Sequence, residues 1–270
     1  MHPIPMRAAW ATDVHLEFVE DAPRDEFCAA LRDTGADCVL LTGDIGQADS
    51  TREHLERMAA AVDRPVYFVL GNHDYYGGSI ASVRDAMERC CRESAHLHWL
   101  NSVGVIGIPP HTALVGHDGW ADGRLGDYAG SDVELNDYYV IDDFKGREGQ
   151  ERLEVLHRLG DEAARHFRRV LPEALAHHRR VVALTHVPPF REACWHEGKL
   201  SNGNWLPHFT CKSVGDAMIE AMRAHPDREL LVLCGHTHGA GEAEILPNLR
   251  VLTGGAVYGA PVVERVLEWG

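Results

Sequence analysis

Short apolar runs alternate with amphipathic stretches at the start of this chain, and that alternation limits the folds open to it. Three runs, Met6 to Thr12, Asp37 to Asp44 and Pro65 to Asp74, have the length and composition of short strands with a buried side. The stretches between them, Arg24 to Thr34 and Thr51 to Val62, place their apolar residues at helical spacing. Strand, helix, strand, helix, strand at this spacing predicts parallel strands joined by helical crossovers, and therefore an α/β fold.

The rest of the chain continues this pattern. We predict further strands at 103–108, 180–186 and ELLVLCGH, helices at about 148–176 and 212–224, and closing strands at AEIL, RVLTG and PVVERVLEW. Since no internal repeat or linker interrupts the sequence, residues 1–270 are predicted to form a single domain. Two stretches with little periodicity, near 110–147 and 188–212, are predicted to be loops that shape specificity.

The composition disfavours several classes of protein. Hydrophobic residues make up 45% of the sequence and charged residues 25%, which is typical of a globular protein rather than a disordered one. A formal net charge of −15 argues against a nucleic-acid partner, because it repels phosphate backbones. The chain has no apolar run long enough for a membrane span, and its start, MHPIPMRAAWATDVH, lacks the apolar core of an export signal. Seven scattered cysteines are typical of reduced thiols, so we expect a cytoplasmic protein.

The predicted strands end in side chains that bind divalent metals. Five strands are followed by such residues: Asp13 and His15, Asp44, Asn72 and His73, His186, and His236 and His238. An isolated H-x-H pair would be weak evidence for a metal site, because histidine has many other uses. In open α/β sheets, however, ligands bind beyond the carboxyl ends of the strands. We therefore expect the five loops to meet and form one metal site.

Taken together, these blocks resemble the signature of the calcineurin-like metallophosphoesterases. They are Asp13-x-His15, Gly43-Asp44, Gly71-Asn72-His73-Asp74, Thr185-His186 and Gly235-His236-x-His238, in that order along the chain. The resemblance implies a four-layer α/β/β/α sandwich of two mixed β-sheets flanked by helices. It also implies two metal ions, the first held by Asp13, His15 and His238 and the second by Asn72, His186 and His236, with Asp44 bridging both.

The ligand types by themselves favour a binuclear hydrolytic site. Two cations about 3.5–4 Å apart can hold the phosphoryl oxygens and the attacking hydroxide of an in-line displacement. Histidine combined with carboxylate and amide oxygens suits Mn²⁺, Fe or Zn²⁺, and we expect Mn²⁺. By the resemblance, His73 contacts the phosphate and gives a proton to the leaving oxygen, while Asp74 orients the His73 ring. An imidazole suits this role because it exchanges a proton near working pH.

Four residues in the two aperiodic stretches are candidates for contacting a substrate. Arg124 has the guanidinium geometry that binds phosphate, and His117 lies in the same stretch. A surface ion pair is an equally good interpretation of Arg124. Trp195 and Trp205 could stack on a substrate from a lid, or could fill a small core under a loop.

The expected activity is hydrolysis of a small phosphoester, with a nucleotide as one candidate substrate. The sequence has Ile45-Gly46-Gln47 after Asp44 and GNHD instead of GNHE, so it departs from the protein serine/threonine phosphatases of this superfamily. It resembles the phosphodiesterase branch more closely, which favours a diester over a monoester. The alternative is a scaffold that keeps the fold and binds a partner with little activity. The oligomeric state is left open.

Overall fold

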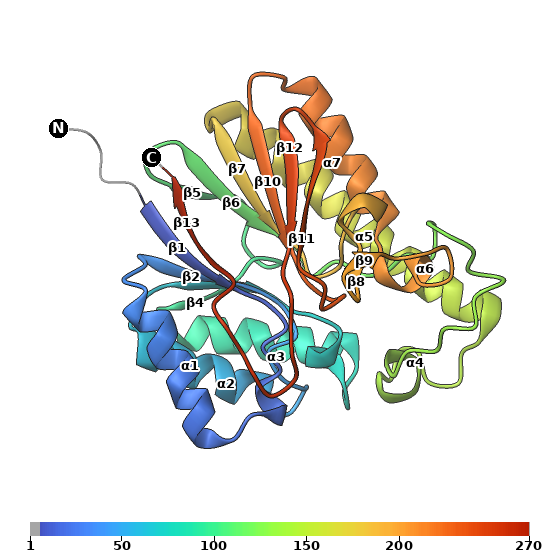
Figure 1. Cartoon of the computed structure of the whole chain (residues 1–270), viewed down its shortest axis with the longest axis horizontal. Coiled ribbons are helices and arrows are strands. Elements are labelled where there is room, and N and C mark those ends of the chain that lie inside the picture. The colour runs from blue at the N-terminus through green and yellow to red at the C-terminus, as the bar shows by residue number, and fades with distance from the viewer. Residues whose placement is uncertain (1–5, 270) are drawn as a thin grey trace.

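Two β-sheets pack face to face, and helices cover the outer face of each sheet (Figure 1). The computed structural model describes residues 6–269. The first sheet has the strand order β13–β1–β2–β3–β4. Its parallel strands are β1 (Met6–Ala11), β2 (Cys38–Thr42), β3 (Val66–Val69) and β4 (Leu97–Trp99), and β13 (Arg265–Trp269) pairs antiparallel with β1.

The second sheet has the strand order β11–β12–β10–β7–β6–β5. Its parallel strands are β6 (Thr112–Gly116), β7 (Arg180–Leu184), β10 (Glu229–Cys234) and β12 (Leu249–Thr253). The edge strands β5 (Ile106–Ile108) and β11 (Gly241–Leu246) are antiparallel to their neighbours. Both sheets are therefore mixed, as expected.

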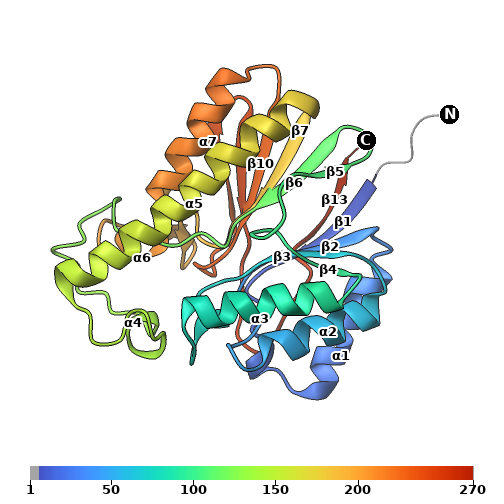
Figure 2. The same cartoon turned by 180° about the vertical axis from the view of Figure 1, so that it is seen from behind.

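Amphipathic helices form the two outer layers (Figure 2). The helices α1 (Asp21–Asp33), α2 (Thr51–Val62) and α3 (Ile80–Glu93) lie against the first sheet, and α5 (Gly149–His177) and α7 (Lys212–Ala224) against the second. Phe27 and Leu31 of α1 are buried on the face that their spacing predicts. Between the sheets, Trp10, Leu114 and Leu233 belong to a third core layer. The four-layer sandwich is thereby confirmed.

Each predicted helix and strand has a counterpart in the structure, although several bounds differ by a few residues. The helices α2 and α7 begin and end at the predicted residues. The prediction of a loop is wrong for Thr112–Gly116, because these residues form β6, which is wholly buried inside the second sheet. A five-residue apolar run has no periodicity that would distinguish a strand from a buried loop.

The remaining parts of the two aperiodic stretches contain only short elements. The first includes α4 (Asp137–Val140). The second includes the 3₁₀ turn η3 (Arg191–Ala193), the hairpin of β8 (Trp195–His196) and β9 (Lys199–Leu200), and α6 (Leu206–Phe209). Among residues 6–269, no helix has both the length and the apolar character that a membrane span requires. The first five residues, part of the stretch that we used to argue against an export signal, lie outside the described range.

Candidate metal centre

The carboxyl ends of five parallel strands from the two sheets meet at one edge of the sandwich. The strands β1, β2 and β3 of the first sheet and β7 and β10 of the second each lead into a loop that carries predicted ligands. Hydrogen bonds between backbones fix these loops together. The N–H of Asp13 donates to the Gly43 carbonyl at 3.0 Å, and the N–H of Gly235 donates to the His186 carbonyl at 2.9 Å. The predicted convergence of the five loops is confirmed.

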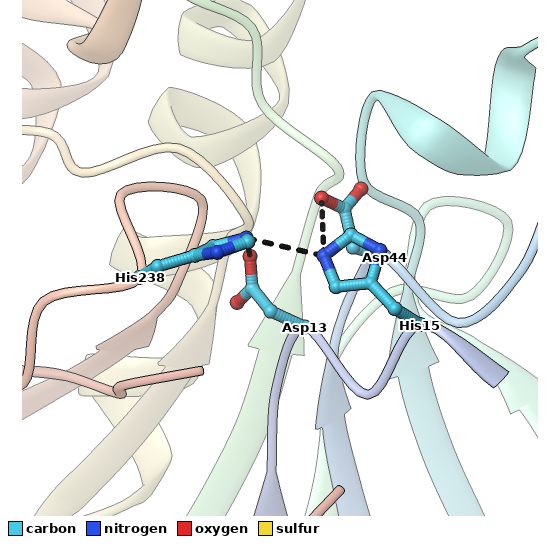
Figure 3. Close-up of side chains that lie close together, drawn as sticks. All are labelled: Asp13, His15, Asp44 and His238. Atoms are coloured by element: carbon cyan, nitrogen blue, oxygen red, sulfur yellow. Dashed lines mark hydrogen bonds and ion pairs between the residues drawn. The ribbon is translucent and has the colours of Figure 1, made fainter. Parts of the chain in front are cut away.

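Asp13, His15, Asp44 and His238 form the first group of ligand atoms (Figure 3). One ligand atom from each residue lies within 4.8 Å of the others. Nε2 of His15 is 3.1 Å from Nε2 of His238 and 3.7 Å from Oδ2 of Asp44. Nε2 of His238 is 3.5 Å from Oδ1 of Asp13. Ring nitrogens and carboxylate oxygens that face one another this closely suit a divalent cation between them.

Asn72, His186 and His236 form a second group on the other side of Asp44. Oδ1 of Asn72 lies 3.0 Å from Nε2 of His186 and 2.9 Å from Nδ1 of His236. Oδ1 of Asp44 lies 3.4 Å from Nε2 of His186. The Asn72 amide is oriented from behind, because its Nδ2 donates to the buried carboxylate of Asp137 at 2.8 Å. The Asn72 oxygen is thereby turned toward the two histidines.

The carboxylate of Asp44 faces both groups, with Oδ2 toward His15 and Oδ1 toward His186. Asp44 is only 1% exposed. Burial raises the pKa of this carboxyl, but the nearby His186 and His73 outweigh burial and hold the pKa well below its usual range. An ionised carboxylate with one oxygen toward each group has the geometry that a bridge between two cations requires.

Three of the histidines are oriented by oxygens on the side away from the centre. His15 Nδ1 lies 3.3 Å from Oε1 of Glu17, His186 Nδ1 lies 2.8 Å from the Thr42 carbonyl oxygen, and His236 Nε2 lies 3.2 Å from the His208 carbonyl oxygen. Each oxygen can accept the N–H of its ring. The other ring nitrogen then turns a lone pair toward the centre, as metal-binding histidines usually do.

The backbone of these loops is strained at the predicted ligands. Seven non-glycine residues in the described chain have positive φ, and five of them are predicted ligands: Asp13, His15, Asp44, His236 and His238. Such strain costs about 1–3 kcal/mol per residue and is concentrated at functional sites. A Cβ on Gly71 would collide with the Asp44 carboxylate, and one on Gly235 with the Asp13 carboxylate. Glycine is required at both positions because the ligands occupy that space.

His73 lies beside the first group. Its ring is 4.5 Å from the His15 ring and stacks on the Tyr76 ring at 4.2 Å. Its Nδ1 lies 3.4 Å from Oε1 of Glu17, and its backbone N–H donates to Oδ1 of Asp44 at 2.9 Å. These contacts hold an imidazole at the border of the centre without using it in either ligand group.

The orienting contact expected from Asp74 comes from Glu17 instead. The buried Asp74 carboxylate accepts hydrogen bonds at 2.7–3.1 Å from the N–H groups of Ile45, Gly46 and Gly71 and from the Thr51 hydroxyl. Asp74 and the His73 ring share no hydrogen bond in the described structure, so the expected role of Asp74 is corrected. Its carboxylate fastens the loop after β2 to the loop after β3, and thus acts on the backbone of the site.

Glu17 and His73 favour each other's charged form. Burial raises the pKa of Glu17, but hydrogen bonds with His15 and His73 outweigh burial and lower it to about 2. Burial lowers the pKa of His73, but the carboxylates of Asp44 and Glu17 raise it to about 9. These carboxylates favour the protonated form of His73, which is the form that a general acid needs. Glu17 was not predicted, and its place two residues after His15 was the only available signal.

His117 and Arg124 do not lie among the two ligand groups. His117 is 4% exposed, and its Nδ1 accepts a hydrogen bond from the N–H of Gly119 at 3.1 Å. Its ring packs beside that of His166 on α5 at 5.2 Å. Arg124 pairs with Asp122 at 3.1 Å and Asp161 at 2.9 Å, which agrees with the ion-pair interpretation.

The two tryptophans of the 188–212 stretch lie around the loop that carries His236 and His238. The Trp205 and Phe209 rings are stacked with their centroids 4.9 Å apart. The Phe209 ring in turn makes a T-shaped contact with the His236 ring, with the centroids 5.1 Å apart. Trp195 packs against Gly239 and Gly241. Trp205 also belongs to a small core cluster with Cys194, Leu206 and Phe209. Both tryptophans thus support the ligand loop from outside.

Two aromatic residues that the sequence analysis did not identify border the centre. The Tyr258 ring lies 4.5 Å from the His15 ring and 4.9 Å from the His238 ring. Phe18 lies 5.2 Å from Tyr258. No strand-end motif marks either residue, because Phe18 ends the 3₁₀ turn η1 (Leu16–Phe18) and Tyr258 lies in an irregular segment.

Two packed mixed sheets, with this centre at their carboxyl edge, define the class of metallophosphoesterases. The family model for calcineurin-like phosphoesterases matches residues 6–240, and the chain belongs to that family. No curated protein shows significant similarity to it.

Solved structures share the fold at low sequence identity. A phosphopantetheinyl hydrolase from Mycobacterium tuberculosis aligns with a TM-score of 0.67 and 14% identity, over 94% of this chain and 90% of its own. A dimetal phosphatase from Danio rerio aligns with a TM-score of 0.59 and 15% identity, over 97% of this chain and 89% of its own.

Proposed function

We propose that this protein is a binuclear metal-dependent phosphoesterase that prefers small phosphodiesters. The observation that carries the proposal is the arrangement of six ligands in two groups of three, with the seventh, Asp44, between the groups. The donor set of histidine nitrogens and amide and carboxylate oxygens fits Mn²⁺, Fe or Zn²⁺, and we favour Mn²⁺. When bound, the two cations would polarise the phosphoryl group and acidify the water that attacks it.

His73 would supply the proton for the leaving group. Its ring lies next to the first group, and the Glu17 carboxylate 3.4 Å from its Nδ1 favours the protonated ring. Glu17 would hold the ring through Nδ1, which leaves Nε2 as the nitrogen that can donate to a leaving oxygen. Asp74 would keep the His73 and Asp44 loops in register.

The preference for a diester rests on the sequence around Asp44 and His73, which departs from the protein phosphatases of the superfamily. A proton donor beside the centre also suits a diester, because an alkoxide leaves with difficulty unless it is protonated. The competing scaffold function is typical of members that lack ligands, whereas this chain places all seven ligands together.

The test is hydrolysis of bis-p-nitrophenyl phosphate and p-nitrophenyl phosphate by chelator-treated protein to which Mn²⁺, Fe²⁺, Zn²⁺ or Mg²⁺ is returned. We expect turnover that depends on metal, is highest with Mn²⁺ and favours the diester. Asp44→Ala should abolish it, while Asp49→Ala, which changes an exposed aspartate five residues away, should not. Absence of turnover with every metal would favour the scaffold, and preference for the monoester would overturn the diester proposal.

A further inference from the structure

The connection between β12 and β13 brings a side chain from near the end of the chain to the metal centre. Residues 254–264 cross from the second sheet to the first (Figure 1). Backbone hydrogen bonds fix both ends of this segment, from Ala256 N–H to the His238 carbonyl at 3.3 Å and from Glu264 N–H to the Trp10 carbonyl at 2.9 Å. Tyr258 lies in a tight turn, which is closed by a hydrogen bond of 3.0 Å from the Ala260 N–H to the Val257 carbonyl. The position of Tyr258 is therefore defined although the segment has no regular structure.

Phe18 and Tyr258 form an aromatic corner at this point. Their ring centroids are 5.2 Å apart and their planes meet at 86°. Phe18 is 54% exposed and Tyr258 is 52% exposed, so each ring has a covered side and an open side. The Tyr258 ring contacts the rings of His15 and His238. The corner is thus continuous with the first ligand group.

Exposed apolar side chains are concentrated here. Six large hydrophobic residues of the described chain are strongly exposed, and four of them belong to this corner or to the 254–264 segment: Phe18, Val257, Tyr258 and Val262. Apolar surface that gathers at one place on a highly charged protein indicates a binding surface. A folded partner seated on Tyr258 would also cover the ligand groups. A part of the substrate itself could occupy this surface and still leave the ligand groups open to the phosphoryl group.

We propose that Phe18 and Tyr258 bind a planar aromatic ring carried by the ester group of the substrate, as in an aryl ester or a nucleotide. This inference rests on the proposed phosphoesterase function. Two rings at right angles offer one face for stacking and one edge for a perpendicular contact, and a flat ring satisfies both. His73, with its ring 6.3 Å from Tyr258, lies on the same side of the centre. The corner is therefore a subsite for the group that leaves.

The test compares substrates with alkoxide leaving groups of similar basicity that differ in the ring. The diesters are benzyl methyl phosphate, cyclohexylmethyl methyl phosphate, the methyl ester of adenosine 5′-phosphate and the methyl ester of ribose 5-phosphate. We expect kcat/KM to be about tenfold or more higher with the ring in at least one of the two pairs, mainly through KM, because one stacked ring is worth about that much in affinity. The pair that shows the preference distinguishes a nucleobase from a simple aryl group.

Substitutions test whether the preference for a ring depends on Phe18 and Tyr258. Phe18→Ser and Tyr258→Ser should bring the ratio close to one, and Tyr258→Phe should restore it. Tyr139→Ser, at an exposed tyrosine on α4, should keep the wild-type ratio. Metal content is measured in each variant. If Tyr258→Ser loses metal, the test rests on Phe18→Ser instead. Hydrolysis without a ring preference, or a preference that survives both serine variants, would overturn this inference and leave the phosphoesterase function intact. No hydrolysis of any ester with any metal would instead contradict the proposed function.

Discussion

The backbone N–H of His73 donates to Oδ1 of Asp44 at 2.9 Å, and the same oxygen lies 3.4 Å from Nε2 of His186. The residue proposed as the acid is thus fastened through its backbone to the residue proposed as the bridge. A change in Asp44 can therefore displace His73, whereas a change of the His73 side chain leaves this hydrogen bond in place. The side chain of His73 is the cleaner target for separating proton transfer from metal binding.

Asp44→Ala should lose the tight binding of both metals. The substitution removes the carboxylate that faces both ligand groups and leaves two cations to repel each other without an anion between them. We expect fewer than two metals per chain by elemental analysis, and activity no higher than that of chelated protein. Circular dichroism should show a retained fold. A variant that kept two metals and near-normal turnover would remove Asp44 from the bridging role.

His236→Ala and His238→Ala should lose different metals. His236 faces Asn72 through Nδ1, whereas His238 faces Asp13 and His15 through Nε2. Anomalous scattering from crystals of each variant soaked in Mn²⁺ would show which of two peaks is missing. The account requires a different missing peak in each variant. Loss of the same peak in both would show that the two histidines serve one ion.

His73→Asn should keep both metals and lose proton transfer. A poor leaving alkoxide needs a proton, and general acid catalysis supplies about 10²–10⁴-fold. We expect a loss of that order in kcat for an alkyl diester. The loss should be much smaller for a nitrophenyl diester, because nitrophenolate leaves without being protonated. Metal content measured on the same samples is the control. Equal losses on the two substrates would make His73 an electrostatic stabiliser only.

Glu17→Gln should shift the basic limb of the pH–rate profile to lower pH. The Glu17 carboxylate helps to raise the pKa of His73 above its ordinary value, so His73 stays protonated until the pH approaches that raised pKa. Without the carboxylate the pKa falls, and the acid form is lost at a lower pH. We also expect a loss of about tenfold to a hundredfold in activity, since Glu17 orients the ligand His15 as well. Glu26→Gln, at an exposed position on α1, is the matched control. If the basic limb of Glu17→Gln stayed at the wild-type pH, Glu17 would not be coupled to the titration of His73.

Much of the ligand set could be predicted because it follows from local pattern and strand direction. Asp13, Asp44 and His186 each lie two residues after the end of an apolar strand, and parallel strands bring such positions to one edge. Glu17 and Asp137 could not be predicted, because their roles depend on which ring or amide they meet after folding.

The same reasoning explains two other misses. Tyr258 reaches the centre on an irregular crossing between sheets, for which sequence periodicity carries no information. The strand Thr112–Gly116 was missed because it is short and buried throughout, and so shows no alternation. Its assignment as loop also made the buried His117, the residue directly after it, a candidate for substrate contact.

The most direct test of the central claim is a titration of metal-free protein with Mn²⁺, in which bound metal and diester hydrolysis are measured on the same samples. Two ligand groups that share Asp44 predict saturation at two Mn²⁺ per chain. Activity should stay low until the second ion binds and should then rise to its maximum. Full activity at one Mn²⁺ per chain, or no activity at two, would contradict a binuclear phosphoesterase.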